Sequence, residues 1–156
     1  VRGLHGGTEL VGRALRLTMR EGREQADVQP LTEQPFDFPT LHEARADGQP
    51  YRYAFGASGS QHADGYRGGI VQLDVESGAT KCFSESGYTF GEPLFVPAPQ
   101  PEHEQDGLLL SMASHQTEAK SALVVLDAQS LAVRAWGNLD LAAPLSFHGS
   151  FLTARA

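Results

Sequence analysis

Two stretches of this chain repeat one another at an offset of 53 residues, and this repeat limits the fold more than any other feature. Residues 68–85 and 121–139 each predict a strand, a tight turn and a return strand, and residues 13–31 form a weaker copy. The matching positions are Leu73 with Leu126, Asp74 with Asp127, Ser77 with Ser130, and Phe83 with Trp136. A β-hairpin is therefore expected three times along the chain.

The spacing of these hairpins predicts an all-β fold of about three propeller blades. A blade is a four-stranded sheet that buries its faces only against its neighbours. Further strands are expected at residues 50–58, 93–99 and 107–114. Because a closed ring needs at least about four blades, we expect the chain to be a fragment of a longer protein, or a ring completed by other chains. A β-sandwich or an irregular barrel fits the same pattern.

Composition argues against several classes of protein. The 156 residues are 40% apolar, which is enough for one buried core. A net charge of -7 without a basic run argues against a nucleic-acid partner. No apolar run has the length of a membrane span and no secretion signal is recognised near Val1, so we expect a soluble, cytoplasmic protein. The single cysteine, Cys82, excludes an internal disulfide and is expected to be buried.

One histidine near the end of the chain stands out from the other five. His148 lies between Phe147 and Gly149 in a short run that predicts a buried strand. A buried imidazole needs partners for both ring nitrogens. His148 is therefore either a satisfied core group or a metal ligand. The remaining histidines lie in loops or near Val1, and we expect His42 and His115 to be structural.

Two carboxylates occupy similarly apolar surroundings. Asp37 lies between Phe36 and Phe38, and Glu92 lies between a glycine and a proline. A carboxylate in such surroundings needs a partner, and one natural partner is the spare N–H of a metal-bound histidine. A position in an exposed turn is the alternative for both acids. The sequence contains no GxSxG elbow, phosphate-binding loop or calcium loop.

Four segments together resemble the C-terminal part of the carotenoid cleavage oxygenases, a family that includes lignostilbene-cleaving dioxygenases and the retinoid isomerase of the eye. They are FDFPTLHEARADGQPYRYAFGAS, GEPLFVPAPQPEHEQDGLLLSM, LVVLDAQSL and PLSFHGSF, and the resemblance runs over about residues 10–152. It implies that the chain is the C-terminal part of one seven-bladed β-propeller domain, with iron(II) held on the axis by four histidines. His148 would be the last of these ligands.

The resemblance also assigns roles to the two carboxylates. Glu92 would hydrogen-bond an iron-bound histidine and would orient His148. Asp37 stands where the family usually has glutamate, so we expect it to reach its histidine only through water. Phe147, Phe36 and Phe38 are candidates to line the substrate tunnel. The other three iron ligands have no counterpart in this chain, so the chain alone is expected to bind iron weakly and to be inactive.

The implied activity is an oxidative cleavage that uses dioxygen. The substrate would be a conjugated carbon–carbon double bond of a carotenoid, an apocarotenoid or a stilbene. A non-catalytic propeller module, used for binding or as a scaffold and completed by oligomerisation or by a partner, is the competing interpretation. A homologue that has lost catalysis, with Asp37 as its mark, is a third. Contact with a membrane surface is not indicated by the sequence.

Overall fold

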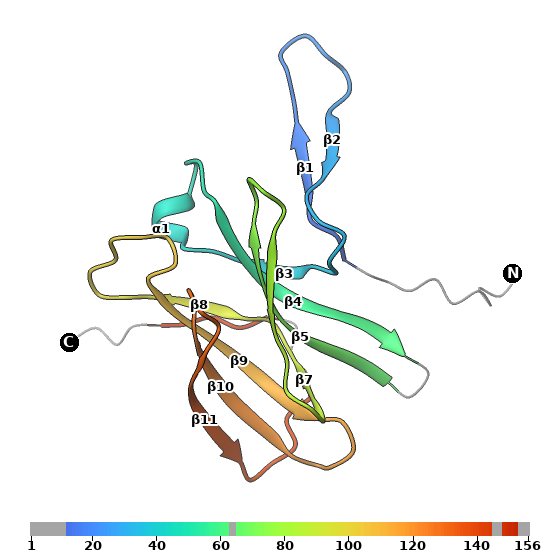
Figure 1. Ribbon diagram of the computed structural model, residues 1–156, viewed down its shortest axis with the longest axis vertical. Helices are drawn as coiled ribbons and strands as arrows, with labels where there is room; N and C mark the ends of the chain where they lie inside the picture. The colour runs from blue at the N-terminus through green and yellow to red at the C-terminus, as the bar shows by residue number, and fades with distance from the viewer. Residues whose placement is uncertain (1–11, 63–64, 145–147, 153–156) are drawn as a thin grey trace, which may run out of the picture.

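The computed structural model describes residues 12–62, 65–144 and 148–152 and is built almost entirely of β-strands (Figure 1). The elements are β1 (Leu15–Thr18), β2 (Asp27–Pro30), β3 (Asp37–Thr40), α1 (Glu43–Ala46), β4 (Tyr53–His62), β5 (Gly65–Asp74), β6 (Thr80–Phe83), β7 (Tyr88–Phe90), β8 (Leu94–Pro97), β9 (Gly107–His115), β10 (Ser121–Asp127) and β11 (Val133–Leu139). The prediction of a β-sheet protein is confirmed.

The strands form three antiparallel sheets. One has the order β3-β4-β5-β6, and a second has the order β11-β10-β9-β7, with β8 also paired to β9. The third is the two-stranded hairpin β1-β2, which projects away from the other two sheets in Figure 1. All three expected hairpins are present, as β1-β2, β5-β6 and β10-β11.

An aspartate stabilises the turn in each of the two repeated hairpins. In the β5–β6 turn, the Asp74 carboxylate accepts hydrogen bonds from the amides of Glu76 and Ser77, at 3.0 and 3.2 Å. In the β10–β11 turn, the Asp127 carboxylate accepts from the amide and the hydroxyl of Ser130, at 2.8 and 2.7 Å. Short side chains that bond their own backbone favour turns. The 53-residue repeat is therefore a repeat of one turn chemistry.

An arginine reinforces each of these turns. The Arg52 guanidinium donates to Asp74 at 2.7 Å, and the Arg134 guanidinium donates to Asp127 at 2.8 Å. The hydrogen bond from Arg52 holds the pKa of Asp74 well below its usual range. The hydrogen bond from Arg134 lowers the pKa of Asp127 to about 2. Both carboxylates are thus ionised at neutral pH.

Two hydrophobic clusters hold the sheets together. The larger cluster joins the sheet of β3 to β6 with the sheet of β7 to β11. Its buried members are Phe55, Ile70, Phe90, Leu109, Ala113, Ala122, Val124, Leu126, Ala128 and Leu131. The smaller cluster contains Phe36, Ala54, Val71, Leu73 and Val75, and Ala14 and Leu31 beside the β1-β2 hairpin pack against it.

Two polar contacts fix the relative position of the larger sheets. The buried side chain of Gln72 donates from Nε2 to the carbonyl oxygen of Ala128 at 2.7 Å. The Glu104 carboxylate accepts hydrogen bonds from the amides of Arg52 and Tyr53, each at 2.9 Å from Oε2. Backbone groups of one sheet are thereby satisfied by side chains of the other, which makes their packing specific.

Two expectations about burial are wrong. Cys82 is exposed, because it lies on β6, which is the edge strand of its sheet. Residues 148–152 are exposed and belong to no strand. The apolar residues of that run therefore do not pack as a strand in the described part of the chain.

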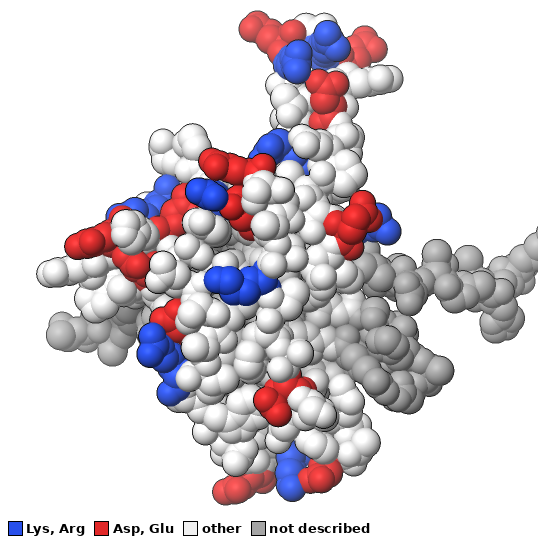
Figure 2. Space-filling view, viewed as in Figure 1, with Lys and Arg blue, Asp and Glu red and all other residues white. Residues whose placement is uncertain are grey.

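The surface carries mixed charge. On the face shown in Figure 2, basic and acidic side chains are interspersed over the described residues, and both kinds gather at the tip of the β1-β2 hairpin. Arg20 and Asp27 form an ion pair on that hairpin, at 3.5 Å. The helix α1 has four residues, and no helix in the described ranges is long and apolar enough to cross a membrane.

The Asp127 ion pair makes stability depend on pH. The pKa of Asp127 falls from 3.8 to about 2 on folding, so its contribution is complete above about pH 4 and is lost as the pH falls toward about 2. We expect Asp127→Asn to lower the free energy of unfolding by about 1 kcal/mol at neutral pH. Urea denaturation at a series of pH values measures this difference, which should shrink as the pH approaches 2.

The exposed Asp140 provides the control for this experiment. Asp140→Asn should change the free energy of unfolding little at any pH. A difference between the chain and Asp127→Asn that stays constant down to the pKa of Asp127 would contradict the assigned ion pair.

Candidate metal centre

The structure brings His148 and Glu92 together, although 56 residues separate them. The distance between His148 Nδ1 and Glu92 Oε1 is 3.4 Å. The second oxygen, Oε2, accepts a hydrogen bond from the amide of Gly149 at 2.9 Å. One carboxylate therefore holds both the imidazole ring and the peptide that follows it.

Glu92 is held in place by its neighbours in the chain. It lies between β7 and β8, where the amide of Gly91 donates to the Met112 carbonyl at 2.9 Å. The hydroxyl of Ser111 donates to the carbonyl of Gly91 at 3.0 Å, and Pro93 is fully buried. The Glu92 side chain is 15% exposed, whereas that of His148 is 79% exposed. A nearly buried acid thus anchors an exposed ring.

This arrangement suits a metal-ligating imidazole. When Nδ1–H donates to a carboxylate, the lone pair of the ring lies on Nε2, which is then free to bind a metal. The exposure of the ring rules out a satisfied core histidine. Within the described residues, no group of three or more histidine, cysteine, aspartate or glutamate side chains gathers to hold a metal ion. His148 can therefore contribute one ligand to a larger centre.

Phe38 lies against the same ring. The centroids of the Phe38 and His148 rings are 5.8 Å apart, and the rings meet edge to face at 77°. Phe38 has a backbone φ of 49°, which residues other than glycine rarely adopt. Such strain persists only where the surrounding structure imposes it, and it concentrates at functional sites. The β3 register with β4 also shifts between Asp37 and Thr40.

The other predicted site residues have different places. The Asp37 carboxylate accepts a hydrogen bond from the amide of Phe38 at 2.9 Å, and in the described part of the chain no histidine bonds to it. Phe36 is buried in the smaller hydrophobic cluster. Phe147 lies outside the described residues. His148, Glu92 and Phe38 are thus brought together, and Asp37 is linked to them only through Phe38.

Sequence reasoning missed one buried histidine. His42 is 5% exposed, and its ring lies 5.3 Å from that of Phe95. Its segment is polar, so no pattern of apolar residues signals this burial. The contact that covers His42 comes from a residue 53 positions later in the chain, on β8.

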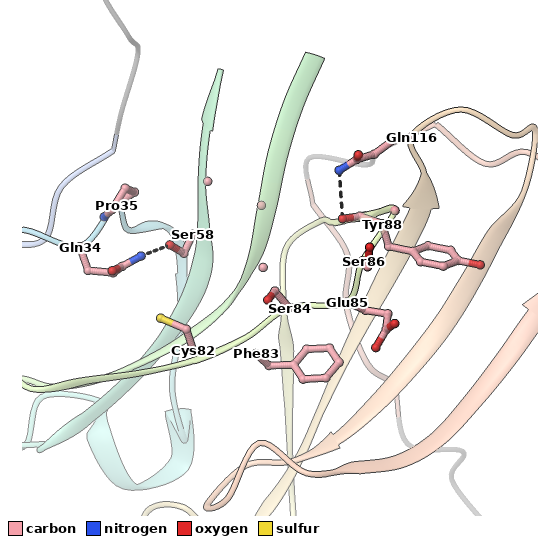
Figure 3. Close-up of a pocket in the computed structure, with 14 residues that line it drawn as sticks. Gln34, Pro35, Ser58, Cys82, Phe83, Ser84, Glu85, Ser86, Tyr88 and Gln116 are labelled. Atoms are coloured by element: carbon pink, nitrogen blue, oxygen red, sulfur yellow. Dashed lines mark hydrogen bonds between the residues drawn. The ribbon is translucent and has the colours of Figure 1, made fainter. Parts of the chain in front are cut away.

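A separate hollow of about 760 Å³ lies where the β6–β7 connection passes the middle of β4 and β5 (Figure 3). Its walls are mainly glycines and small polar side chains. Gln34 Nε2 donates to the Ser58 hydroxyl at 2.6 Å, and Gln116 Nε2 lies 3.4 Å from the Tyr88 carbonyl. Neither His148 nor Glu92 lines this hollow, so it is not the candidate metal centre.

The sheets and the carboxylate-bound ring define an all-β protein with a candidate metal-ligating histidine. The chain belongs to the carotenoid cleavage oxygenase family, because the family model described as RPE65, retinal pigment epithelial membrane protein, matches residues 8–153. The family resemblance of the sequence motifs is thereby confirmed.

Two curated relatives show the extent of the similarity. The chain is 32% identical over 145 residues to apocarotenoid-15,15'-oxygenase of Synechocystis sp., which covers 90% of this chain and 29% of that protein. It is 30% identical over 117 residues to the mitochondrial carotenoid-cleaving dioxygenase of Homo sapiens, which covers 74% of this chain and 20% of that protein. The chain thus spans less than a third of the length of either relative.

Solved structures of the Synechocystis enzyme give the same picture. A tryptophan-to-alanine mutant of Synechocystis apocarotenoid oxygenase matches with a TM-score of 0.80 at 30% identity, over 91% of this chain and 30% of that one. A cobalt-substituted form matches with a TM-score of 0.73 at 31% identity, over 83% of this chain and 28% of that one.

Loss of the Glu92 carboxylate should release the segment after His148. In Glu92→Ala the amide of Gly149 loses a charged acceptor, and we expect its hydrogen exchange to become about tenfold faster, the effect of roughly 1.4 kcal/mol. Exchange measured by NMR on the chain and on the variant tests this. Glu85→Ala, which removes an exposed carboxylate ahead of β7, is the control. Unchanged exchange at Gly149 would show that Glu92 does not hold the segment.

Proposed function

We propose that this chain is the C-terminal part of a non-haem iron(II) dioxygenase that cleaves a conjugated carbon–carbon double bond of a carotenoid, an apocarotenoid or a stilbene. The observation that carries the proposal is that the Glu92 carboxylate contacts both the His148 ring and the Gly149 amide. The chain in which this occurs belongs to the carotenoid cleavage oxygenase family. The relatives are an apocarotenoid oxygenase and carotenoid-cleaving and torulene dioxygenases.

The two larger sheets support two blades of a seven-bladed propeller, and the β1-β2 hairpin would belong to a third. The sheets of β3 to β6 and of β7 to β11 have the size of blades, and they pack face to face through the larger hydrophobic cluster. The outer face of β9 and β10 is also apolar: Leu123 pairs with Met112 and Val125 pairs with Leu110 across it. Leu123 is 38% exposed, so this face lacks a full cover. A further blade packed there would bury it.

The metal proposal rests on the chemistry of the donor. One solved structure of the Synechocystis enzyme is cobalt-substituted, which implies a metal centre in that protein. In this chain His148 fits as one ligand, with Nε2 free and the ring exposed. The remaining imidazoles would come from other blades, and iron(II) bound by them would supply the activation of dioxygen.

The residues of this chain would then orient the His148 ring and provide apolar surface for the substrate. A hydrogen bond from Nδ1–H of His148 to Glu92 would leave Nε2 as a lone-pair donor in a fixed direction. Phe38 limits rotation of the ring from the side and presents an apolar edge to a polyene. Asp37, which bonds the Phe38 amide, positions Phe38 and reaches a histidine of another blade through water. Phe36, Phe38 and Phe147 stay candidates for the wall of the tunnel.

A non-catalytic propeller module is the second candidate. The observation that favours it is the uncovered apolar face of β9 and β10, where Leu123 is 38% exposed and a partner could pack. In that case the carboxylate-bound ring would serve only to fasten the last segment to β8.

Replacement of His148 separates these functions. In the protein with its full set of blades, His148→Ala should lower the iron content and abolish polyene cleavage, and Glu92→Gln should weaken iron binding by about tenfold. Metal analysis and the loss of polyene absorbance measure the two effects. His103→Ala, in an exposed loop, is the matched control. Normal iron and full cleavage in His148→Ala would exclude the ligand role, and absence of iron and cleavage in the unaltered protein would favour the binding module.

A further inference from the structure

A second hollow lies directly beside the Glu92–His148 pair. It has a volume of about 370 Å³ and lies between the β3–α1 segment, β8 and the residues after His148. Gly149, whose amide bonds Glu92, forms part of its wall, together with Leu94 and Phe95. A volume of this size lies in the range of small-molecule sites, roughly 300–1,000 Å³.

His42 is the unexplained polar group in this wall. Its side chain is 5% exposed, and neither Nδ1 nor Nε2 has a hydrogen-bond partner within the described structure. Buried polar groups are nearly always paired, so an orphaned imidazole calls for a partner that the fold does not supply. Its backbone is fixed, because its carbonyl accepts hydrogen bonds from the amides of Arg45 and Ala46 at 2.9 and 3.0 Å.

A ligand in the hollow would reach a nitrogen of His42 only after the ring turns, and this turn costs no hydrogen bond. Both nitrogens are covered by protein atoms in this conformation. Rotation about the Cβ–Cγ bond breaks no hydrogen bond, because none is made. The remaining contact is with Phe95, which is itself stacked on the fully buried Phe55 at 5.6 Å. Phe95 therefore gives the His42 ring a fixed apolar surface on one side.

The walls also select the chemistry of the occupant. Leu41, Leu94, Phe95 and Phe151 provide apolar surface, which suits a hydrocarbon body. Glu43 also lines the hollow, and a carboxylate beside the hollow would disfavour an anionic ligand. A neutral imidazole offers one donor and one acceptor. The complementary group is a neutral oxygen, either a carbonyl or a hydroxyl.

We propose that this hollow binds an apolar molecule by an uncharged oxygen at one end, with His42 as its hydrogen-bond partner. The inference extends the proposed function, because such a ligand would lie next to the candidate metal centre. It rests on the hollow and on His42, however, and requires no iron. Binding can therefore be tested separately from cleavage.

Three probes with similar carbon skeletons test the proposal on the full chain: butylbenzene, benzylacetone and phenylbutyrate. Isothermal titration should show that benzylacetone, with its carbonyl, binds more tightly than the hydrocarbon or the carboxylate. His42→Phe should weaken benzylacetone binding about fivefold, the effect of one hydrogen bond, and should leave butylbenzene within about twofold. His42→Gln, which keeps a donor, should retain the preference for benzylacetone.

His115→Phe is the control, since His115 accepts a bond from the Glu118 amide and does not line the hollow. Urea denaturation of each variant verifies that it is folded. Equal affinity of the unaltered chain for benzylacetone and butylbenzene, or an equal loss of both in His42→Phe, would overturn the proposal and leave buried water as the partner of His42. Probe binding by the chain, together with absence of iron and cleavage in the protein with its full set of blades, would overturn only the proposed function.

Discussion

The carboxylate of Glu92 determines where the end of the described chain lies. Residues 148–152 belong to no strand and are exposed, so few packing contacts hold them. Two oxygens of one side chain hold the ring of His148 and the amide of Gly149. Leu94 also lies close to Gly149: a Cβ at that position would lie 3.1 Å from Leu94 Cδ1, which is a tight contact. The candidate metal centre therefore depends on β8 and on the turn that precedes it.

The turn between β7 and β8 depends on how the two larger sheets pack. Gly91 is bonded to β9 through Met112 and Ser111, and β9 is central in its sheet. The sheet is then held to its neighbour by the larger hydrophobic cluster and by the buried bond from Gln72 to Ala128. The turn that carries Glu92 is thus fixed by packing on its core side, and the carboxylate bonds the exposed His148 on the other side. This explains how a ring that is 79% exposed can still have a defined orientation.

The sequence predicts the parts of this fold that local chemistry determines. The Asp-x-x-Ser turns are local, since each aspartate bonds amides two or three residues later, and the hairpins they close were all expected. The short elements β3, β7 and α1 were not expected, because each has three or four residues and depends on partners distant in the chain. The exposure of Cys82 has the same cause: it reflects the place of β6 at a sheet edge, which no local pattern records.

Glu92 and Asp37 bond different kinds of partner, and the lengths of their side chains explain this difference. Glu92 reaches outward from the chain and bonds groups 56 and 57 residues away. Asp37 is one methylene shorter, and its carboxylate bonds the amide of the next residue. The Phe38 amide is the donor of that hydrogen bond. Phe38 has a φ of 49°, and its ring lies beside His148. A glutamate at position 37 would be one methylene longer, whereas the shorter aspartate side chain bonds the adjacent amide of Phe38. The same apolar setting, FDFP against FGEPLF, therefore yields one acid that bonds a distant histidine and one that bonds the backbone of the aromatic residue packed against that histidine.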